Sequence, residues 1–224
     1  MKKHLVNLKK IINNIIPNYA IIPLLLCVIL NFTIYSGVRL FYRNRVFHDL
    51  TSTFDDKIPV IPVFIIIYLG SYIYWTVNYI IISRQSKVVC YRFVAADIIG
   101  KIICGIVYIS FPTTNIRPDV HVNGLFTYLL NFLYNADAAN NLFPSIHCMV
   151  SWYCFSGIKN CKNISFWHKM VSLIMTILIC VSTLTTKQHV LVDVFSGIFI
   201  AELTLQLAFK LQMSNSYKYI NQEV

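Results

Sequence analysis

Six apolar runs, most of them long enough to cross a lipid bilayer, dominate the chain. Hydrophobic residues make up 57% of the 224 positions and charged residues only 12%, a balance that is rare in soluble domains. A membrane-spanning helix needs about 20 apolar residues, and its backbone groups must be paired within the segment. We therefore predict an all-α integral membrane bundle of six transmembrane helices within residues 19–212, crossing near Tyr19–Val38, Pro59–Ser83, Val88–Ser110, Pro144–Ile158, Phe166–Leu184 and His189–Leu211.

Three segments do not fit a full crossing on their own. The fourth run, Pro144–Ile158, is short, so it must borrow flanking residues or sit where the bilayer is thinned. Residues 1–18 are basic, with apolar residues at helical spacing, and we expect them to lie along the inner membrane surface. Residues 213–224 are predicted to form a polar cytoplasmic tail.

The distribution of lysine and arginine predicts the orientation, because short cytoplasmic loops collect basic residues. With six crossings, most cations fall on the side of the Lys-rich N-terminus. We expect the protein to lie in the plasma membrane, with both termini cytoplasmic and the loops after the first, third and fifth crossings extracytoplasmic. The net charge of +10 is dispersed between apolar runs and forms no continuous stripe, so we expect no nucleic acid partner.

Several cations nevertheless fall on the predicted outer side. Four of these cations lie in the first predicted outer loop. We expect them to pair with nearby carboxylates or to contact lipid headgroups: Arg39, Arg43, Arg45 and Lys57. Arg117 and Lys187 lie next to other polar motifs, where an anionic substrate is the favoured explanation.

Thiols and charges inside the apolar runs are predicted to be structural. The seven cysteines are scattered, and the chain has neither a Cys-x-x-Cys nor a His-Glu-x-x-His pattern, so we expect no disulfide framework, no metal site and no cofactor. Asp97 and Lys101 are four residues apart in the third run and are predicted to pair.

The start of the last run carries a candidate nucleophile. His189 and Asp193 are four residues apart, so on a helix they project from one face and can touch. Asp193 can accept a hydrogen bond from one ring nitrogen of His189, which leaves the other nitrogen free to attack phosphorus. Taken alone, such a pair is more often a structural hydrogen bond.

A second histidine begins the fourth run, in the sequence Phe143-Pro144-Ser145-Ile146-His147. When protonated, His147 could donate its proton to a departing oxygen, while Ser145 and the free backbone amides of the first helical turn could face an anion. Two predicted crossings separate His147 from His189, so both motifs open on the same side of the membrane. Arg117 and Lys187 lie on that side too and can bind phosphate oxygens.

These residues together resemble the type 2 phosphatidic acid phosphatase superfamily. Arg117-Pro118, Pro144-Ser145-x-His147 and His189-x3-Asp193 match its motifs, and Ser182 stands seven residues before His189, as the family serine does. The resemblance covers roughly Phe111 to Gly197. It implies a phosphohistidine at His189, no metal, phosphate contacts that include Ser182, and a lipid phosphate or diphosphate substrate that enters from the membrane.

Three positions depart from the family pattern. Ser110 replaces a lysine, Thr183 replaces an arginine and Ile146 replaces a glycine, so two phosphate-binding cations of the pattern are missing. The Phe-Pro-Ser-x-His string with a residue other than glycine at x also resembles the inositol phosphorylceramide synthase branch, whose members transfer a phospho-headgroup between lipids.

Three functions therefore stay open from the sequence. The favoured one is a metal-independent lipid phosphate phosphatase, with His189, His147 and Asp193 as catalytic residues and Arg117, Ser145, Lys187 and Ser182 as phosphate-binding residues. The second is a phospho-headgroup transferase. The third, kept open by Ser110 and Thr183, is a membrane binding protein or transporter without catalysis.

Overall fold

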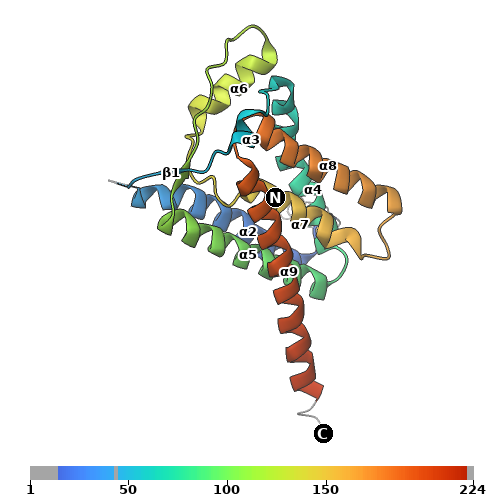
Figure 1. Ribbon diagram of the computed structural model, residues 1–224. Helices are drawn as coiled ribbons and strands as arrows, with labels where there is room; N and C mark the ends of the chain where they lie inside the picture. Colours follow the sequence, from blue (N-terminus) through green and yellow to red (C-terminus); the bar gives the residue numbers. More distant parts are fainter. Residues whose placement is uncertain (1–14, 43–44, 221–224) are drawn as a thin grey trace, which may run out of the picture.

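The computed structural model describes residues 15–42 and 45–220, with side chains up to residue 211. Helices account for most of the described chain (Figure 1). Most of the predicted N-terminal surface segment, residues 1–14, lies outside the described residues, and α9 continues as helix into the predicted polar tail. The α-helices are α2 (Asn18–Gly37), α3 (Thr53–Asp56), α4 (Ile65–Ser83), α5 (Lys87–Ser110), α6 (Leu125–Ala136), α7 (Ile146–Lys159), α8 (Phe166–Thr185) and α9 (Leu191–Ile220).

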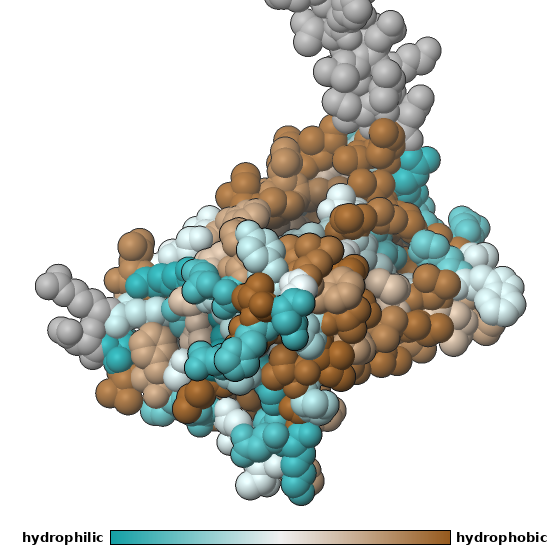
Figure 2. Space-filling model, turned by 90° about the horizontal axis from the view of Figure 1, so that it is seen from above, coloured by the Kyte–Doolittle hydropathy of each residue, from teal (hydrophilic) through white to brown (hydrophobic). Residues whose placement is uncertain are grey.

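Five helical segments in the described chain are long and apolar enough to cross a membrane, which makes this an integral membrane protein. They are Asn18–Phe41, Pro62–Ser83, Lys87–Ser110, Phe166–Thr185 and Leu191–Leu211, and the first and second include the short 3-10 helices η1 (Val38–Phe41) and η2 (Pro62–Phe64). Many of their apolar side chains face outward, and Figure 2 shows apolar residues over much of the surface. Such an exterior suits lipid as the surrounding medium.

The structure does not show the sixth predicted crossing. The corresponding helix, α7, has only 14 residues, which at 1.5 Å per residue gives about 21 Å, less than the roughly 30 Å of a hydrocarbon core. Instead of standing at the periphery, α7 packs against α4, α5, α8 and α9. Its length therefore fits a short helix enclosed by the longer ones.

A glycine allows α9 to lie directly on the start of α7. A Cβ atom at Gly197 would collide with the backbone carbonyl oxygen of Ser145 and come within 3.2 Å of the Met149 nitrogen. At the same contact, the Ser145 amide donates a hydrogen bond to the Asp193 carbonyl oxygen at 3.1 Å. The two helix starts are thus held together by backbone contacts that tolerate no side chain at position 197.

We expect Gly197→Ala to lower the free energy of unfolding by about 1 to 3 kcal/mol, because rigid backbone must move to admit the methyl group. Gly70→Ala is the matched control, since a Cβ atom there meets nothing within 4 Å and alanine favours a helix interior. Thermal unfolding in detergent compares the two variants. Equal stability of both would contradict the tight α7–α9 contact.

The loops at one end of the bundle are also tied to one another. Strand β1 (His48–Asp49) pairs in parallel with β2 (Thr113–Thr114), in the register His48 with Thr113, and the Ile61 amide donates to the Thr185 carbonyl oxygen at 3.0 Å. These contacts join the loop after α2 to those after α5 and α8. The polar motifs therefore gather at this end of the bundle.

Candidate active site

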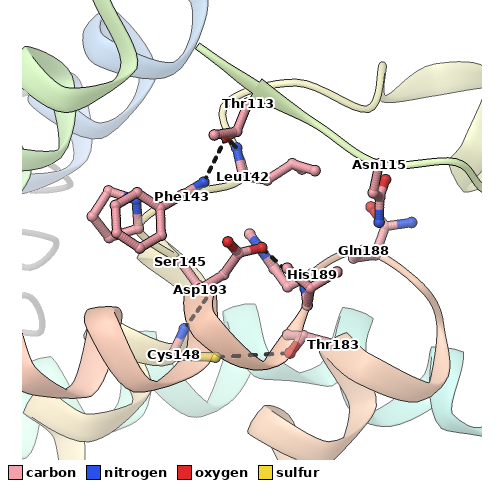
Figure 3. A network of polar contacts seen from close by, with 12 residues as sticks. Thr113, Asn115, Leu142, Phe143, Ser145, Cys148, Thr183, Gln188, His189 and Asp193 are labelled. Carbon is pink, nitrogen blue, oxygen red and sulfur yellow. Dashed lines mark hydrogen bonds and ion pairs between the residues drawn. The ribbon is translucent and has the colours of Figure 1, made fainter. Parts of the chain in front are cut away.

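His189 and Asp193 form the predicted pair. Asp193 Oδ2 accepts hydrogen bonds from His189 Nδ1 at 3.2 Å and from the Val190 amide at 3.0 Å. Both side chains are buried, with 7% of His189 and none of Asp193 exposed. A carboxylate acceptor places the ring proton on Nδ1, so Nε2 is the nitrogen with a free lone pair. Figure 3 shows the pair facing each other at the start of α9.

The turn before α9 positions the backbone of His189. The carbonyl oxygen of Thr183, in the last turn of α8, accepts hydrogen bonds from the amides of Gln188 and His189 at 2.9 and 3.1 Å. Lys187 has a φ of 51°, in the left-handed region that reverses the chain direction. The short connection from α8 to α9 therefore fixes the backbone of the histidine.

The segment between α2 and α4 holds the start of α9 as well. Asp55 Oδ1 accepts a hydrogen bond from the free Leu191 amide at 2.7 Å, and the Asp55 carbonyl oxygen accepts one from Lys187 Nζ at 2.8 Å. Burial raises the pKa of Asp55, but hydrogen bonds from Ser52 and Leu191 and the charge of Lys187 outweigh it, so the pKa is lowered overall. A carboxylate at the positive end of a helix is stabilising, and Asp55 thereby positions the His189 segment.

His147 lies opposite His189 at the start of α7. The two ring centroids are 6.1 Å apart, so both imidazoles are close enough to contact the same bound group. His147 stacks on Tyr68 at 4.5 Å and meets Trp75 edge-on at 5.0 Å. Its Nε2 is buried and has no hydrogen-bond partner within the described residues.

Both histidines line a cavity of about 260 Å³ whose walls also carry two guanidinium groups, Arg117 and Arg39. Several buried nitrogens here have no hydrogen-bond partner among the described residues: Arg39 Nε, Arg117 Nε, His147 Nε2 and Gln188 Nε2. All four can carry a hydrogen to donate. Buried polar atoms are almost always paired. These four nitrogens outnumber the one unpartnered acceptor found in the described lining, Asn140 Oδ1, so they favour an anion as the missing partner.

Arg117 is held in place by the loops. Its Nη2 donates to Gln188 Oε1 at 2.8 Å, its Nη1 donates to the Asp137 carbonyl oxygen, and its guanidinium lies 5.1 Å from the ring centroid of Tyr134. Tyr134 in turn donates to the Thr186 carbonyl oxygen at 2.9 Å. The group is thus fixed before any ligand arrives.

Arg39 is the residue that the sequence analysis missed. The sequence led us to expect that Arg39 contacts lipid headgroups or pairs with carboxylates of its own loop. In the structure, Arg39 lines the cavity. Its Nη2 pairs with Asp137 Oδ1 at 2.9 Å and donates to the Tyr35 hydroxyl at 3.0 Å. Arg39 and Asp137 are 98 residues apart. No local spacing could have revealed this contact, and the position of Arg39 at the C-terminal end of the first apolar run was its only signal.

Three predicted phosphate contacts lie elsewhere among the described side chains. Lys187 reaches the Asp55 carbonyl oxygen and lines a neighbouring cavity. Ser145 caps α7 by accepting from the Cys148 amide at 3.3 Å, and Ser182 donates to the Ile179 carbonyl oxygen of its own helix at 2.7 Å. None of the three lines the cavity between the histidines, so their phosphate contacts stay predictions.

The described residues contain no group of three or more His, Cys, Asp or Glu side chains that could hold a metal ion. The cavity itself offers two imidazoles, one of them paired with a carboxylate, and two guanidinium groups.

A family model described as the PAP2 superfamily matches residues 91–217, more than half of the chain. The chain belongs to the PAP2 superfamily. Membership indicates a phosphatase or phosphotransferase that acts on phosphate esters. The match includes Arg117, both histidines and Asp193 but not Arg39. It gives no support to the inositol phosphorylceramide synthase branch, and neither the curated proteins nor the solved structures that were compared include a match.

Proposed function

We propose that this PAP2 protein is a lipid phosphate phosphatase that works through a phosphohistidine at His189. The observation that carries the proposal is the opposed pair of histidines, 6.1 Å apart across a cavity with unpartnered donors. His189 has a carboxylate partner, which can stabilise the charge that a nucleophile gains, whereas His147 has none among the described residues. This asymmetry supports different roles for the two rings.

In the proposed mechanism, His189 Nε2 attacks phosphorus as the bond to the leaving oxygen breaks. Asp193 stabilises the positive charge that the ring of His189 gains, and protonated His147 gives its proton to the departing alkoxide. Neutral His147 then takes a proton from water, which attacks phosphorus and breaks the phosphorus–nitrogen bond. Phosphate leaves, and both histidines return to their starting states.

We further propose that Arg117 and Arg39 neutralise the phosphoryl oxygens. Arg117 supplies a positive charge that Ser110 and Thr183 cannot. Arg39 is paired with Asp137, but Arg39 Nε and Arg117 Nε are free to donate. Donors that are already oriented stabilise developing charge without reorganising.

Arg39→Ala is expected to lower kcat/KM for a lipid phosphate by about a hundredfold, because one preorganised donor group is lost. Arg39→Lys retains the charge but loses the planar fork of donors, so an intermediate value is expected. Arg45→Ala is the matched control, since Arg45 is exposed in the loop that follows η1. Unchanged kcat/KM in Arg39→Ala would limit Arg39 to its ion pair with Asp137.

For the membrane arrangement, we propose six crossings, with α7 as a short sixth element, both termini cytoplasmic and the active site extracytoplasmic at the plasma membrane. The basic residues support this orientation through the positive-inside tendency. Cysteine labelling with an impermeant reagent in intact cells tests it. Labelling of a cysteine placed at exposed His121, but not of one placed at Lys162 between α7 and α8, is expected.

Phospho-headgroup transfer is the second candidate. Tyr68, Tyr72 and Trp75 surround the ring of His147, and such an apolar wall favours a lipid alcohol over water as the second reactant. Incubation of the purified protein with labelled phosphatidic acid, with and without added lipid alcohols, separates the two activities. Free phosphate in both cases supports hydrolysis, whereas a labelled lipid that forms only with the alcohol supports transfer.

The phosphohistidine itself can be trapped. After a short incubation with a labelled lipid phosphate, label should remain on the protein in alkali and be lost in acid, as a phosphorus–nitrogen bond requires. Label that survives acid would indicate a phosphate ester and would contradict the mechanism.

A further inference from the structure

Helix α6 carries large apolar side chains on its outward face. Leu125, Tyr128 and Phe132 follow one another at spacings of three and four residues, which places them on one side of the helix. Between 58% and 66% of each is exposed, and no residue of α6 is charged. Large apolar side chains that gather on one face mark an interaction surface.

The opposite face of α6 packs on a membrane-spanning segment. Leu130 is fully buried together with Ile65 and Tyr68 of α4, and the span that contains α4 starts at Pro62. On the same turn of α4, Ile66 is 53% exposed and faces outward, as a side chain in contact with lipid does. Figure 1 shows α6 at the end of the bundle where α9 starts. Helix α6 therefore lies beside a lipid-facing surface, at the level where that span ends.

These features favour a lipid surface as the partner of the outward face. The face continues the apolar exterior of α4, and it offers no charge with which a charged macromolecule could pair. Tyrosine is typical of the boundary between hydrocarbon and headgroups, because its ring is apolar and its hydroxyl can reach water. Tyr128, in the middle of the face, fits this boundary.

The C-terminal end of α6 holds both arginines of the cavity. The ring centroid of Tyr134 lies 5.1 Å from the Arg117 guanidinium. Asp137, which follows α6, accepts from Arg117 through its carbonyl oxygen and pairs with Arg39 through Oδ1 at 2.9 Å. Because Phe132 and Tyr134 are two residues apart on one helix, a shift of the outward face also shifts the contacts to the arginines.

We infer that the outward face of α6 binds the membrane surface at this end of the bundle and that this contact keeps Arg117 and Arg39 in place at the cavity. The surface contact rests on exposure and packing, whereas its effect on the cavity rests on the proposed function of the two arginines. The partner is the bilayer surface itself and not a substrate molecule. Since lipid binds the arrangement in which both guanidinium groups are held, the bilayer raises the affinity of the cavity for an oxyanion.

Fluorescence quenching in lipid nanodiscs tests the surface contact. An environment-sensitive fluorophore is attached to Phe132→Cys in a Cys161→Ser background, because the other six cysteines are buried. Lipids with a nitroxide close to the headgroup should quench this label strongly, and its emission should shift to the blue. The same label on His121→Cys, an exposed position before α6, should respond less. Equal quenching at the two positions, or none at either, would overturn the surface contact.

Binding of inorganic phosphate, measured by calorimetry in nanodiscs, tests the effect on the cavity. Phe132→Ser should raise the Kd by about tenfold, because the apparent Kd rises as the fraction of protein with both arginines in place falls. Phe132→Trp keeps an aromatic ring and should retain the wild-type Kd. Phe166→Ser is the matched control, since Phe166 is similarly exposed, at 67%, and begins α8 at the end opposite Thr185.

An unchanged Kd in Phe132→Ser, or an equal rise in Phe166→Ser, would overturn the effect of α6 on the arginines. Thermal unfolding should show that all three variants remain folded. If wild-type protein binds phosphate but hydrolyses no lipid phosphate, the proposed phosphatase activity fails and the inference stands. If wild-type protein binds no phosphate, the effect on the cavity is overturned, and quenching still decides whether α6 contacts the membrane.

Discussion

His189→Ala should abolish hydrolysis of lipid phosphates and should also abolish the acid-labile label on the protein. The imidazole is the proposed nucleophile, and no other histidine in the described chain has a carboxylate partner. Removal of a residue that acts within a catalytic unit typically lowers kcat by roughly four to six orders of magnitude. Release of labelled phosphate and retention of label on the protein measure the two effects.

The exposed His121 provides a matched control, because His121→Ala removes an imidazole outside the cavity. Thermal unfolding should show that both variants remain folded. Retained turnover in His189→Ala, or label that persists on that variant, would refute the nucleophile assignment. Loss of activity in both variants would instead indicate a general disturbance of the protein.

His147→Asn should slow the enzyme in a way that depends on the leaving group. General acid catalysis contributes about a hundredfold to ten-thousandfold, so kcat for an alkyl phosphate should fall by that range. An aryl phosphate has a leaving group that departs without a proton, and its first step should be nearly unaffected. Since release of the phosphoryl group also needs a base, the phosphohistidine should accumulate and give a burst of one phenol per protein.

Burst kinetics with an aryl phosphate, followed in the millisecond range, distinguish this role from a structural one. An equal loss of the first step for alkyl and aryl substrates would contradict the assignment of His147 as the acid. Tyr68→Leu is a useful companion, because it removes the ring stacked on His147 at 4.5 Å without removing the imidazole. Tyr68→Leu should lower kcat for alkyl and aryl phosphates by less than His147→Asn lowers kcat for the alkyl phosphate.

The catalytic pair was readable from the sequence because its geometry is local. Residues four apart at a helix start face each other whatever surrounds them, and the structure has the His189–Asp193 contact at 3.2 Å. The approach of His147 to His189 was readable for a different reason, since two consecutive segments return the chain to the same end. That expectation required only a count of apolar runs. In the structure the chain does return to the same end, with His147 and His189 side by side, although α7 is short.

The wall of the cavity could not be predicted in the same way. Arg39 meets Asp137 across 98 residues, and Asp55 reaches the start of α9 across 136 residues. Lys187, although two residues before His189, turns toward Asp55. Proximity in the sequence therefore gave no sign of the contact between Lys187 and Asp55, and it indicated no cavity neighbour for Arg39.

The sequence by itself determined that the chain is a helical membrane protein with a histidine–carboxylate pair and a second histidine at one end, because hydropathy and helical spacing act over a few turns. Only the tertiary structure decided which cations line the cavity and that α7 is too short to match a full crossing. Those features depend on how distant helices pack, and Gly197 shows that a single missing side chain can set that packing.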